Sequence, residues 1–322
     1  MIILTDNIAF AQSCVPLDCE WRNCDVSRLA DPVAGLAGEL FDSADIMICE
    51  VPGSEYWDYL YAVENATHSQ YDVLSRLAIS ACQPPDRTLC CAGSGQQFHG
   101  FKNRSWEACR GNIHLSAFLK PQMEVQGDAA GFIIAAVIAA LQTAGSFKLK
   151  GAGPAIKWVN DILIEGDKVG GVLVRLQKQG RVTESAVIGI GLNVEQKPSL
   201  KRDTYVPGVA AISDFVGASE NCRHVDVLPL LMENLGGNLE SLQRGQFARL
   251  LDLYRQHSLI LGRRVTVYKD TRQASSEIVA RGLVESIGTS LELFIQGHPE
   301  PVTNGRLVME FRPNDLHQIQ QD

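Results

Sequence analysis

The sequence predicts an α+β fold in which a mixed or antiparallel sheet is covered by helices and followed by a small C-terminal β-barrel. Residues 157–194 carry three Val- and Ile-rich runs separated by two polar turns, a pattern typical of consecutive antiparallel strands. The near-continuous apolarity of these runs indicates that helices cover the sheet. From residue 262 onward, short strand-like runs are separated by turn residues, which predicts the barrel.

Composition limits the classes of function. The 322 residues include 45% hydrophobic and 20% charged side chains, which is ordinary for a globular protein of about two domains. A net charge of −8 argues against a general binder of nucleic acid or anionic membranes. The nine scattered cysteines form no CxxC, and residues 1–10 lack a basic segment typical of signal peptides. We therefore expect a reduced, cytoplasmic protein with neither DNA nor membrane partners.

The cysteines at positions 14, 19 and 24 recur at an even interval of five residues. No histidine stands beside them, so we prefer an ordinary structural role to a metal site and expect no tightly bound metal. The apolar run at 129–141 is too short to span a bilayer and predicts a buried helix.

The chain divides into four expected segments. They are an N-terminal extension at 1–40 without a helix-turn-helix pattern, a main domain at 41–256, the barrel at 257–315 and a tail at 316–322. Within the main domain, the patterns predict strands at 45–51, 87–92 and 112–119 and helices at 55–81, 128–143 and 225–257.

A long polar loop is expected at residues 93–111, with four glycines and no periodicity. Its glycine backbone and the cations Lys102, Arg104 and Arg110 could surround an anion. A solvated loop without a ligand is the plainer interpretation, and the loop alone does not decide between them.

Polar residues interrupt the apolar runs at 157–194: Lys157, Asn160, Asp161, Lys168 and Asn193. Lys168 follows Asp161 by seven residues across a tight turn, so an antiparallel hairpin would bring the two together. A lysine there could neutralise a carboxylate, and an aspartate could orient an incoming amine. Taken singly, Lys168 could equally be a solvated turn residue and Asn193 a strand-end cap.

The combination is more specific. Lys-Trp-x-Asn-Asp from 157, Lys-x-Gly-Gly from 168 and Gly-x-Gly-x-Asn from 189 together resemble the biotin protein ligases, with Val159 where the family usually has proline. The resemblance extends upstream through Gln97, Gly100 and Trp106 and covers about residues 46–312. It implies a class II synthetase-like catalytic domain of the biotin/lipoate ligase superfamily, which uses ATP and Mg²⁺ to form biotinyl-AMP. Biotin would then pass to a lysine of a biotin carboxyl carrier domain; a homodimer stays open.

Residue roles follow from the same resemblance. The catalytic set would be Lys168, Asp161 and Arg104. The biotin slot would comprise Gln97, Gly100, Lys168, Gly171, Gly189, Gly191 and Ser54. The nucleotide would contact Lys102, Arg104, Trp106, Asn160 and Asn193, with Asn193 also near the Mg²⁺ ion.

The sequence departs from the family pattern in three places. The loop at 100–106 is shorter and poorer in glycine and arginine than the family's Gly-Arg-Gly-Arg-x-Gly-Arg-x-Trp. The family's Ser-Thr appears as Ser54-Glu55, and Glu310 stands near an expected arginine that Arg312 could replace.

Two alternatives remain. One is a lipoate or octanoate ligase or transferase; octanoyl transferases use a cysteine nucleophile, and no cysteine lies between Cys109 and Cys222. The other is a non-catalytic ligand-binding protein on the same scaffold.

Overall fold

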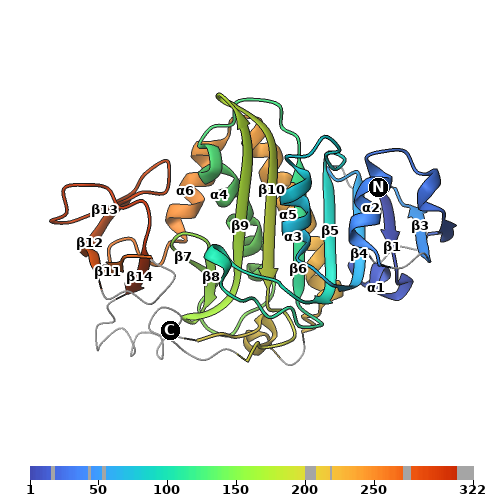
Figure 1. Ribbon diagram of the computed structural model, residues 1–322. Helices are drawn as coiled ribbons and strands as arrows, with labels where there is room; N and C mark the ends of the chain where they lie inside the picture. Colours follow the sequence, from blue (N-terminus) through green and yellow to red (C-terminus); the bar gives the residue numbers. More distant parts are fainter. Residues whose placement is uncertain are drawn as a thin grey trace.

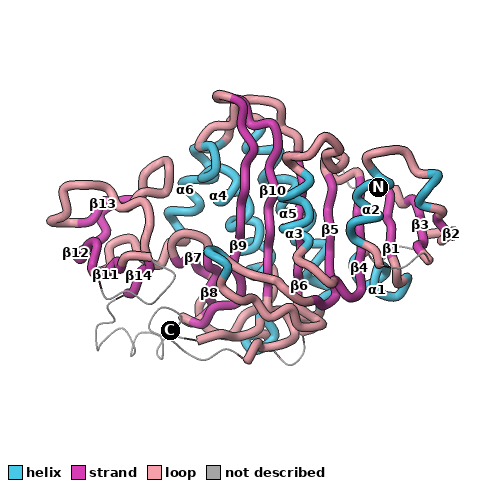
Figure 2. Tube along the Cα trace, in the orientation of Figure 1, coloured by secondary structure: helices cyan, strands magenta, loops and turns pink. Residues whose placement is uncertain are grey.

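A ten-stranded mixed sheet forms the centre of the molecule, with a four-stranded sheet at one end (Figures 1 and 2). The computed structural model describes residues 1–15, 19–42, 45–52, 56–199, 208–217, 220–270 and 277–309. The order of the large sheet is β2-β3-β1-β4-β5-β6-β10-β9-β8-β7. Its strands are β1 (Ile2–Thr5), β2 (Arg22–Cys24), β3 (Ile46–Glu50), β4 (Tyr59–Ala66), β5 (Thr88–Gly95), β6 (Ile113–Leu119), β7 (Ala155–Lys157), β8 (Asp161–Ile164), β9 (Asp167–Gln179) and β10 (Val182–Leu192).

Helices pack on both faces of this sheet, whereas the apolar runs predicted a helical cover on its inner face only. The helices are α1 (Ile8–Cys14), α2 (Val33–Leu40), α3 (Gln70–Leu77), α4 (Asp128–Gly145), α5 (His224–Gln243) and α6 (Phe247–Gln256). Short 3₁₀ turns are η1 (Val26–Arg28), η2 (Phe101–Asn103) and η3 (Ile212–Phe215). Helices α1, α4, α5 and α6 share one apolar core, and α2 and α3 contribute to the core on the opposite face.

Helix α4 is the central helix of the larger core. Phe132, Ile134 and Val137 have no exposed surface, and 72% of the helix is buried inside the protein. Within the described residues it is the one helix long and apolar enough to cross a bilayer. Its burial against the sheet and α5 explains that apolarity without a membrane, as the sequence predicted.

Strand β4 corrects the expected helix at residues 55–81. Its residues lie between β1 and β5 and pair in parallel with both. Leu60 through Val63 are buried on both faces, so their continuous apolarity reflects a central strand rather than a helix. Only the last part of the expected helix is helical, as α3. The helix expected at 225–257 is also divided, since Gly245 turns the chain with a φ of 78° between α5 and α6.

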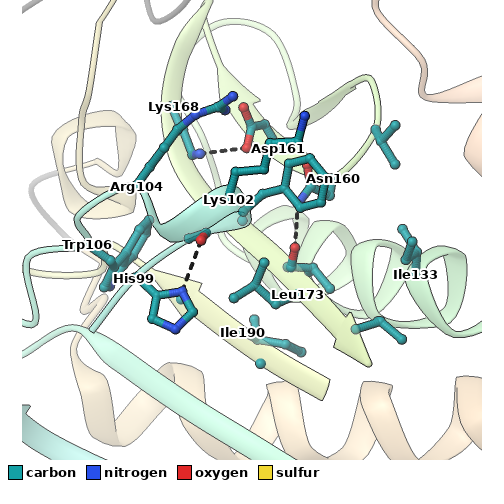
Figure 3. Close-up of a pocket in the computed structure, with 18 of the residues that line it drawn as sticks. His99, Lys102, Arg104, Trp106, Ile133, Asn160, Asp161, Lys168, Leu173 and Ile190 are labelled. Carbon is teal, nitrogen blue, oxygen red and sulfur yellow. Dashed lines mark hydrogen bonds and ion pairs between the residues drawn. The ribbon is translucent and has the colours of Figure 1, made fainter. Parts of the chain in front are cut away.

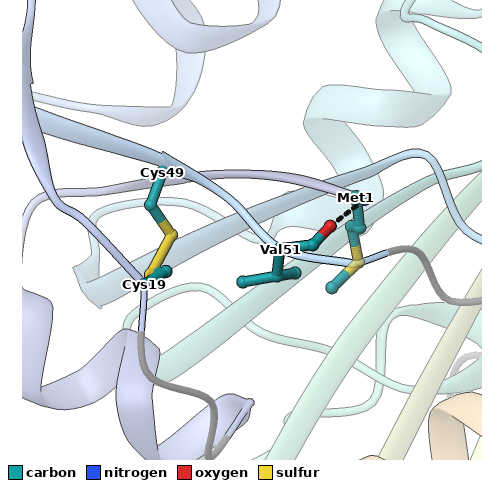
Figure 4. Close-up of a disulfide and its surroundings, with 4 residues drawn as sticks. All are labelled: Met1, Cys19, Cys49 and Val51. Atoms are coloured by element: carbon teal, nitrogen blue, oxygen red, sulfur yellow. Dashed lines mark hydrogen bonds between the residues drawn. A yellow bond between two sulfur atoms is a disulfide. The ribbon is translucent and has the colours of Figure 1, made fainter.

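Residues 1–40 contribute directly to the main sheet. Strand β1 lies between β3 and β4, antiparallel to the first and parallel to the second. The predicted boundary at residue 40 therefore does not interrupt the sheet. Beside it, Cys19 and Cys49 form a disulfide with Cα atoms 6.2 Å apart, and the Met1 amino group donates to the Val51 carbonyl at 2.8 Å (Figure 4). The expectation that all cysteines are reduced is wrong for this pair.

The C-terminal segment is an open antiparallel sheet and not the predicted barrel. Its order is β13-β12-β11-β14, with β11 (Arg264–Tyr268), β12 (Ile278–Ile287), β13 (Leu293–Ile295) and β14 (Arg306–Met309). Among the described residues β13 and β14 form opposite edges, so the sheet does not close on itself. Beyond its pairing with β12, β13 makes one isolated bridge, between Leu293 and Val302, and does not pair with β14. The predicted tail at 316–322 lies outside the described residues.

Candidate active site

A cavity of about 650 Å³ opens between the large sheet and the C-terminal sheet. Its floor comes from β8, β9 and β10, and its rim from the loop around Trp106. The C-terminal sheet contributes Asp270, Leu291 and residues 303–307 to the wall. A concave site of this size, with apolar walls and a few convergent polar groups, is typical of a pocket for a small molecule.

Lys168 and Asp161 form an ion pair at the floor of this cavity (Figure 3). The Lys168 Nζ atom donates to Asp161 Oδ1 at 2.5 Å, and their side chains are 23% and 22% exposed. The two-residue turn Glu165-Gly166, with φ values of 50° and 84°, joins β8 to β9. A register shift between Ile162 and Leu163 then brings the two side chains together. The predicted hairpin and the predicted pairing are confirmed.

The first run of the apolar ribbon is itself a hairpin, which corrects the expected single strand. Lys157 ends β7 and pairs with Asp161 at the start of β8, so Asn160 lies in the connecting turn. Asn160 is held there from both directions: its side chain donates to the Val172 carbonyl, and its carbonyl accepts from the Val172 amide at 3.1 Å. Asn160 and Lys157 both line the cavity, and Lys157 is only 7% exposed.

Three of the predicted glycines occupy positions of close approach. A Cβ atom at Gly171 would lie 3.4 Å from both Asp161 Oδ1 and Lys168 Nζ. One at Gly189 would lie 3.0 Å from the ring of Tyr71. At Gly191 it would lie 2.5 Å from the indole of Trp106, closer than side chains can pack. Gly189 and Gly191 therefore admit two aromatic rings to the sheet surface, whereas a Cβ at Gly171 would be in ordinary contact with the ion pair; all three line the cavity.

The loop between β5 and β6 folds over the cavity as an irregular hairpin. The Gly100 amide donates to the Arg104 carbonyl at 2.7 Å, and the Trp106 amide donates to the Phe98 carbonyl at 3.0 Å. Lys102 and Arg104 both pair with Asp270, at 3.1 Å and 2.8 Å between nitrogen and carboxylate oxygen. The Asp270 side chain is 3% exposed. Both predicted phosphate ligands therefore line the cavity and share one carboxylate, which balances only one of their two charges.

Asn193 is the candidate metal ligand. It is 1% exposed and lines the cavity, and its Nδ2 atom donates to the Ala210 carbonyl at 3.1 Å. Its Oδ1 atom is buried without a hydrogen-bond partner among the described residues. Mg²⁺ accepts amide oxygens together with phosphate oxygens and water, so this atom fits a supporting role beside a bound nucleotide. Asp161, the nearest predicted carboxylate, is occupied by Lys168.

Two predicted site residues are not brought to the cavity by the described structure. Gln97 is exposed, has a φ of 59° and is not among the residues that line the cavity. Ser54 lies outside the described residues, as do Glu55, Glu310 and Arg312.

Several cavity residues escaped the sequence analysis. His114 is 3% exposed; its Nδ1 atom accepts from Trp106 Nε1 at 3.3 Å, and its Nε2 atom lies 3.1 Å from the Cys109 carbonyl. Burial lowers the pKa of His114 to about 4, so its ring is neutral. The alternation of residues 112–119 could have indicated that His114 shares a strand face with Ser116, which also lines the cavity.

A second histidine stands at the cavity rim. The His99 Nε2 atom lies 2.9 Å from Asp72 of α3, and its ring meets Tyr71 edge-on. Burial lowers the pKa of His99, but the hydrogen bonds with Asp72 and the Gly100 carbonyl, together with the charge of Asp72, outweigh it and raise the pKa above its ordinary value. Asp72 lies on a different element, so no local sequence pattern could have revealed this pair.

Comparison with known proteins defines the class. Residues 79–193 match the family model for the biotin/lipoate A/B protein ligase family. The solved structure of a biotin protein ligase from Aquifex aeolicus in complex with biotin and ATP aligns over 79% of this chain and 99% of its own, with a TM-score of 0.59 and 16% identity. A biotin protein ligase-like protein of unknown function from Silicibacter sp. TM1040 aligns over 78% of this chain and 95% of its own, with a TM-score of 0.55 and 10% identity. The chain has the biotin protein ligase fold.

Curated relatives agree with this class. The bifunctional ligase/repressor BirA of Bacillus subtilis is 35% identical over 135 residues, which cover 40% of this chain and 41% of that protein. The biotin–[acetyl-CoA-carboxylase] ligase of Mycobacterium tuberculosis is 28% identical over 215 residues, or 66% of this chain and 75% of its own length. The match thus spans less than half of BirA. The matched residues 79–193 include the motifs that begin at 157, 168 and 189, so the resemblance that these motifs carry is confirmed.

Proposed function

We propose that the protein is an ATP-dependent ligase that adenylates biotin and transfers it to a lysine of a biotin carboxyl carrier domain. The Lys168–Asp161 pair carries this proposal, because it places a cation and a carboxylate together at the floor of a cavity of suitable size. Named relatives that catalyse such ligation support the substrate choice.

In the first step, a biotin carboxylate oxygen attacks the α-phosphorus of ATP, and the bond to pyrophosphate breaks. Lys168 neutralises the biotin carboxylate as it enters and the charge on the nonbridging oxygens as the bond forms. Asp161 is its counter-ion before the acid binds. The half-buried position of the pair makes this charge more effective than it would be in water.

In the second step, a lysine amine of the carrier domain attacks the acyl carbon, and AMP leaves. The attacking lysine must lose a proton to become nucleophilic. Asp161 can accept a hydrogen bond from it once Lys168 has turned to the adenylate, which orients the nitrogen lone pair. Asn160, fixed by Val172, lies beside Asp161 and would contact the nucleotide.

The nucleotide would bind across the loop and the end of β10. Lys102 and Arg104 would contact the phosphates, and Trp106 would cover the adenine. Mg²⁺, when bound with ATP, neutralises phosphate charge, and the unpartnered Oδ1 atom of Asn193 would hold one of its coordination positions. Gly100, Gly171, Gly189 and Gly191 would border biotin.

For Gln97 and Ser54 the predicted biotin contacts stay predictions, as do the cytoplasmic location, the homodimer and the absence of DNA partners.

One observation favours a second candidate, a ligand-binding protein that does not adenylate. Both loop cations are paired with a buried carboxylate, so phosphate must compete with Asp270 for them. Such a protein would still bind the carboxylic acid ligand but would not react it with ATP.

Pyrophosphate release with ATP, Mg²⁺ and either biotin or lipoate separates these functions. We expect release with biotin, and transfer of label from biotin to a carrier domain. Pyrophosphate release with lipoate but not with biotin would indicate that the protein is a lipoate ligase. No release with either acid, combined with biotin binding in calorimetry, would favour the binding protein.

Lys168→Ala tests the residue on which the proposal depends. We expect pyrophosphate release to fall about 100-fold or more, because the charge that stabilises the transition state is lost. Lys178→Ala is the matched control: Lys178 lies on the same strand and pairs with Asp128 at 2.7 Å, but does not line the cavity. Equal activity of the two variants would refute the role of Lys168.

A further inference from the structure

Three potential metal ligands meet in the core behind the active-site cavity. They are Cys14 at the end of α1, Cys91 in β5 and His224 at the start of α5, and their ligand atoms all lie within 4.8 Å of one another. Cys14 and Cys91 have no exposed surface, and His224 is 7% exposed. None of the three lines the cavity. The ligase chemistry therefore does not account for this cluster.

The cluster brings charge into an apolar environment. Contact with Cys14 and His224 lowers the pKa of Cys91 to about 6 despite burial. Burial lowers the pKa of His224, but its contact with Cys91, together with Glu195 and the Ser13 backbone, raises this pKa above the ordinary value. Burial raises the pKa of Cys14 well above its ordinary value. The contacts within the cluster thus favour a thiolate at Cys91 inside the core, where an isolated charge brings little net stability.

One ring nitrogen of His224 indicates that the cluster binds a ligand. The His224 Nε2 atom is buried and has no hydrogen-bond partner among the described residues. An unpaired buried polar atom costs about 1–3 kcal/mol in a folded protein, so such atoms usually have a ligand, an ion or a water. The backbone of this histidine is fixed by Glu195, whose Oε1 atom accepts from the His224 amide at 2.7 Å. Phe10 packs against its ring with centroids 5.8 Å apart.

We propose that Cys14, Cys91 and His224 bind a thiophilic divalent metal ion of the Zn²⁺ class. Two thiolates and a neutral imidazole are a donor set that Zn²⁺ prefers, and their charges cancel that of the ion. Binding requires both thiols and the coordinating ring nitrogen to be deprotonated, and any protons that they carry are released to solvent. Metal–ligand bonds of about 2.0–2.3 Å require ligand atoms to approach one another more closely than 4.8 Å, which small side-chain rotations provide. A water molecule would occupy the fourth position.

The ion would join three elements that are far apart in the sequence. Strand β5 continues directly into the loop that carries Lys102, Arg104 and Trp106. Glu195, which holds the His224 amide, follows Asn193 by two residues. The ion would therefore hold together β5 and the segment around Glu195, which lead to cavity residues. Its main effect would be to raise the stability of the folded protein. This departs from the expectation of a protein without tightly bound metal.

Adjacent cysteines of β5 provide a matched pair of variants. Cys90 and Cys91 both have no exposed surface, but they face opposite sides of the sheet and belong to different cores. Cys91→Ala removes a proposed metal ligand, whereas Cys90→Ala removes a sulfur atom from the core on the opposite face of the sheet. A general packing defect would affect both variants, and loss of metal would affect only Cys91→Ala.

Cobalt is the probe for the test. The full chain, purified under reducing conditions and freed of metal with a chelator, is titrated with Co²⁺ and then with Zn²⁺. We expect one Co²⁺ per chain with a thiolate-to-cobalt charge-transfer band, displacement by Zn²⁺, and a higher melting temperature with Zn²⁺. Cys90→Ala should keep the band and Cys91→Ala should lose it.

Three results would overturn the proposal: no charge-transfer band in the wild-type protein, a band that persists in Cys91→Ala, or a disulfide between Cys14 and Cys91 in the reduced preparation by mass spectrometry. If Cys91→Ala fails to fold, alkylation of the wild-type protein decides. Zn²⁺ should then protect Cys14 and Cys91, and leave the exposed Cys82 as reactive as before. Equal alkylation of Cys14 and Cys91 with and without Zn²⁺ contradicts the site.

Discussion

Arg104 donates to Asp270 at 2.8 Å, and this ion pair ties the loop over the cavity to the C-terminal sheet. Lys102 strengthens the same connection, since its Nζ atom also donates to the Asp270 carbonyl at 2.8 Å. One buried carboxylate thus pairs with both cations that the sequence assigned to phosphate. Nucleotide binding and the contact between the two sheets are therefore linked.

Asp270→Asn tests this link. The substitution keeps the size of the side chain and removes its charge, so both ion pairs are lost and only uncharged acceptors still compete with phosphate for Lys102 and Arg104. We expect the dissociation constant for ATP to fall about tenfold, the change produced by roughly 1.4 kcal/mol from a charge-assisted contact. Calorimetry or a fluorescent ATP analogue measures it.

Glu39→Gln is the control for Asp270→Asn. Glu39 also pairs with an arginine, Arg76, at 2.6 Å, but neither residue lines the cavity. It should leave ATP binding unchanged. Weaker ATP binding in Asp270→Asn would mean that Asp270 positions the cations and does not compete with phosphate.

Local patterns predicted the centre of the site well. The turn at Glu165-Gly166 and the seven-residue spacing between Asp161 and Lys168 are properties of one hairpin, so the sequence contains all that is needed to pair them. Strand β4 was misread because Leu60–Val63 are buried on both faces and thus show no alternation. Apolar runs of this kind do not distinguish a central strand from a buried helix.

Contacts between distant segments could not be predicted from local patterns. Asp270 meets Arg104 across 166 residues, and Cys14, Cys91 and His224 come from three separate elements. The even spacing of Cys14, Cys19 and Cys24, from which no metal site was predicted, has no counterpart in the fold. Cys14 lies in the cluster with His224, Cys19 bonds to Cys49, and Cys24 is a free cysteine at the edge of the sheet.

Gly191→Ala is expected to displace Trp106. The added Cβ atom would lie 2.5 Å and 2.7 Å from indole carbons, so the ring must move away from the sheet. Overpacking of this kind costs about 1–3 kcal/mol, and a displaced indole also removes the surface proposed for adenine. We expect a lower melting temperature together with weaker ATP binding.

A glycine with free space provides the control for Gly191→Ala. Gly237 in α5 has no atom within 4 Å of an added Cβ, and alanine is the better helix former. Gly237→Ala should keep ATP binding and the melting temperature or raise the latter. Normal ATP binding by Gly191→Ala would show that the contact between Trp106 and the sheet is not needed for the nucleotide.

His114 should make the protein acid-sensitive. Its pKa in the folded protein is lowered by burial to about 4, below the ordinary value of 6.5 expected in the unfolded chain. Between pH 4 and pH 6.5, the His114 side chain therefore binds a proton in the unfolded chain but not in the folded protein. The stability due to neutral His114 is fully present above pH 6.5 and is lost as the pH falls from 6.5 towards 4, by about 3 kcal/mol. Protonation also removes the acceptor that Nδ1 offers to Trp106.

Urea denaturation at pH 7.5 and near pH 4, in the wild type and in His114→Asn, isolates this contribution. The asparagine Oδ1 atom can still accept from Trp106 but does not titrate, so carboxylates and other histidines contribute equally to both proteins. We expect the wild type to lose about 3 kcal/mol more unfolding free energy than the variant between the two pH values. An equal loss in the two proteins would mean that His114 is hydrated or protonated in the folded state, and that the neutral ring does not hold Trp106 over Gly191.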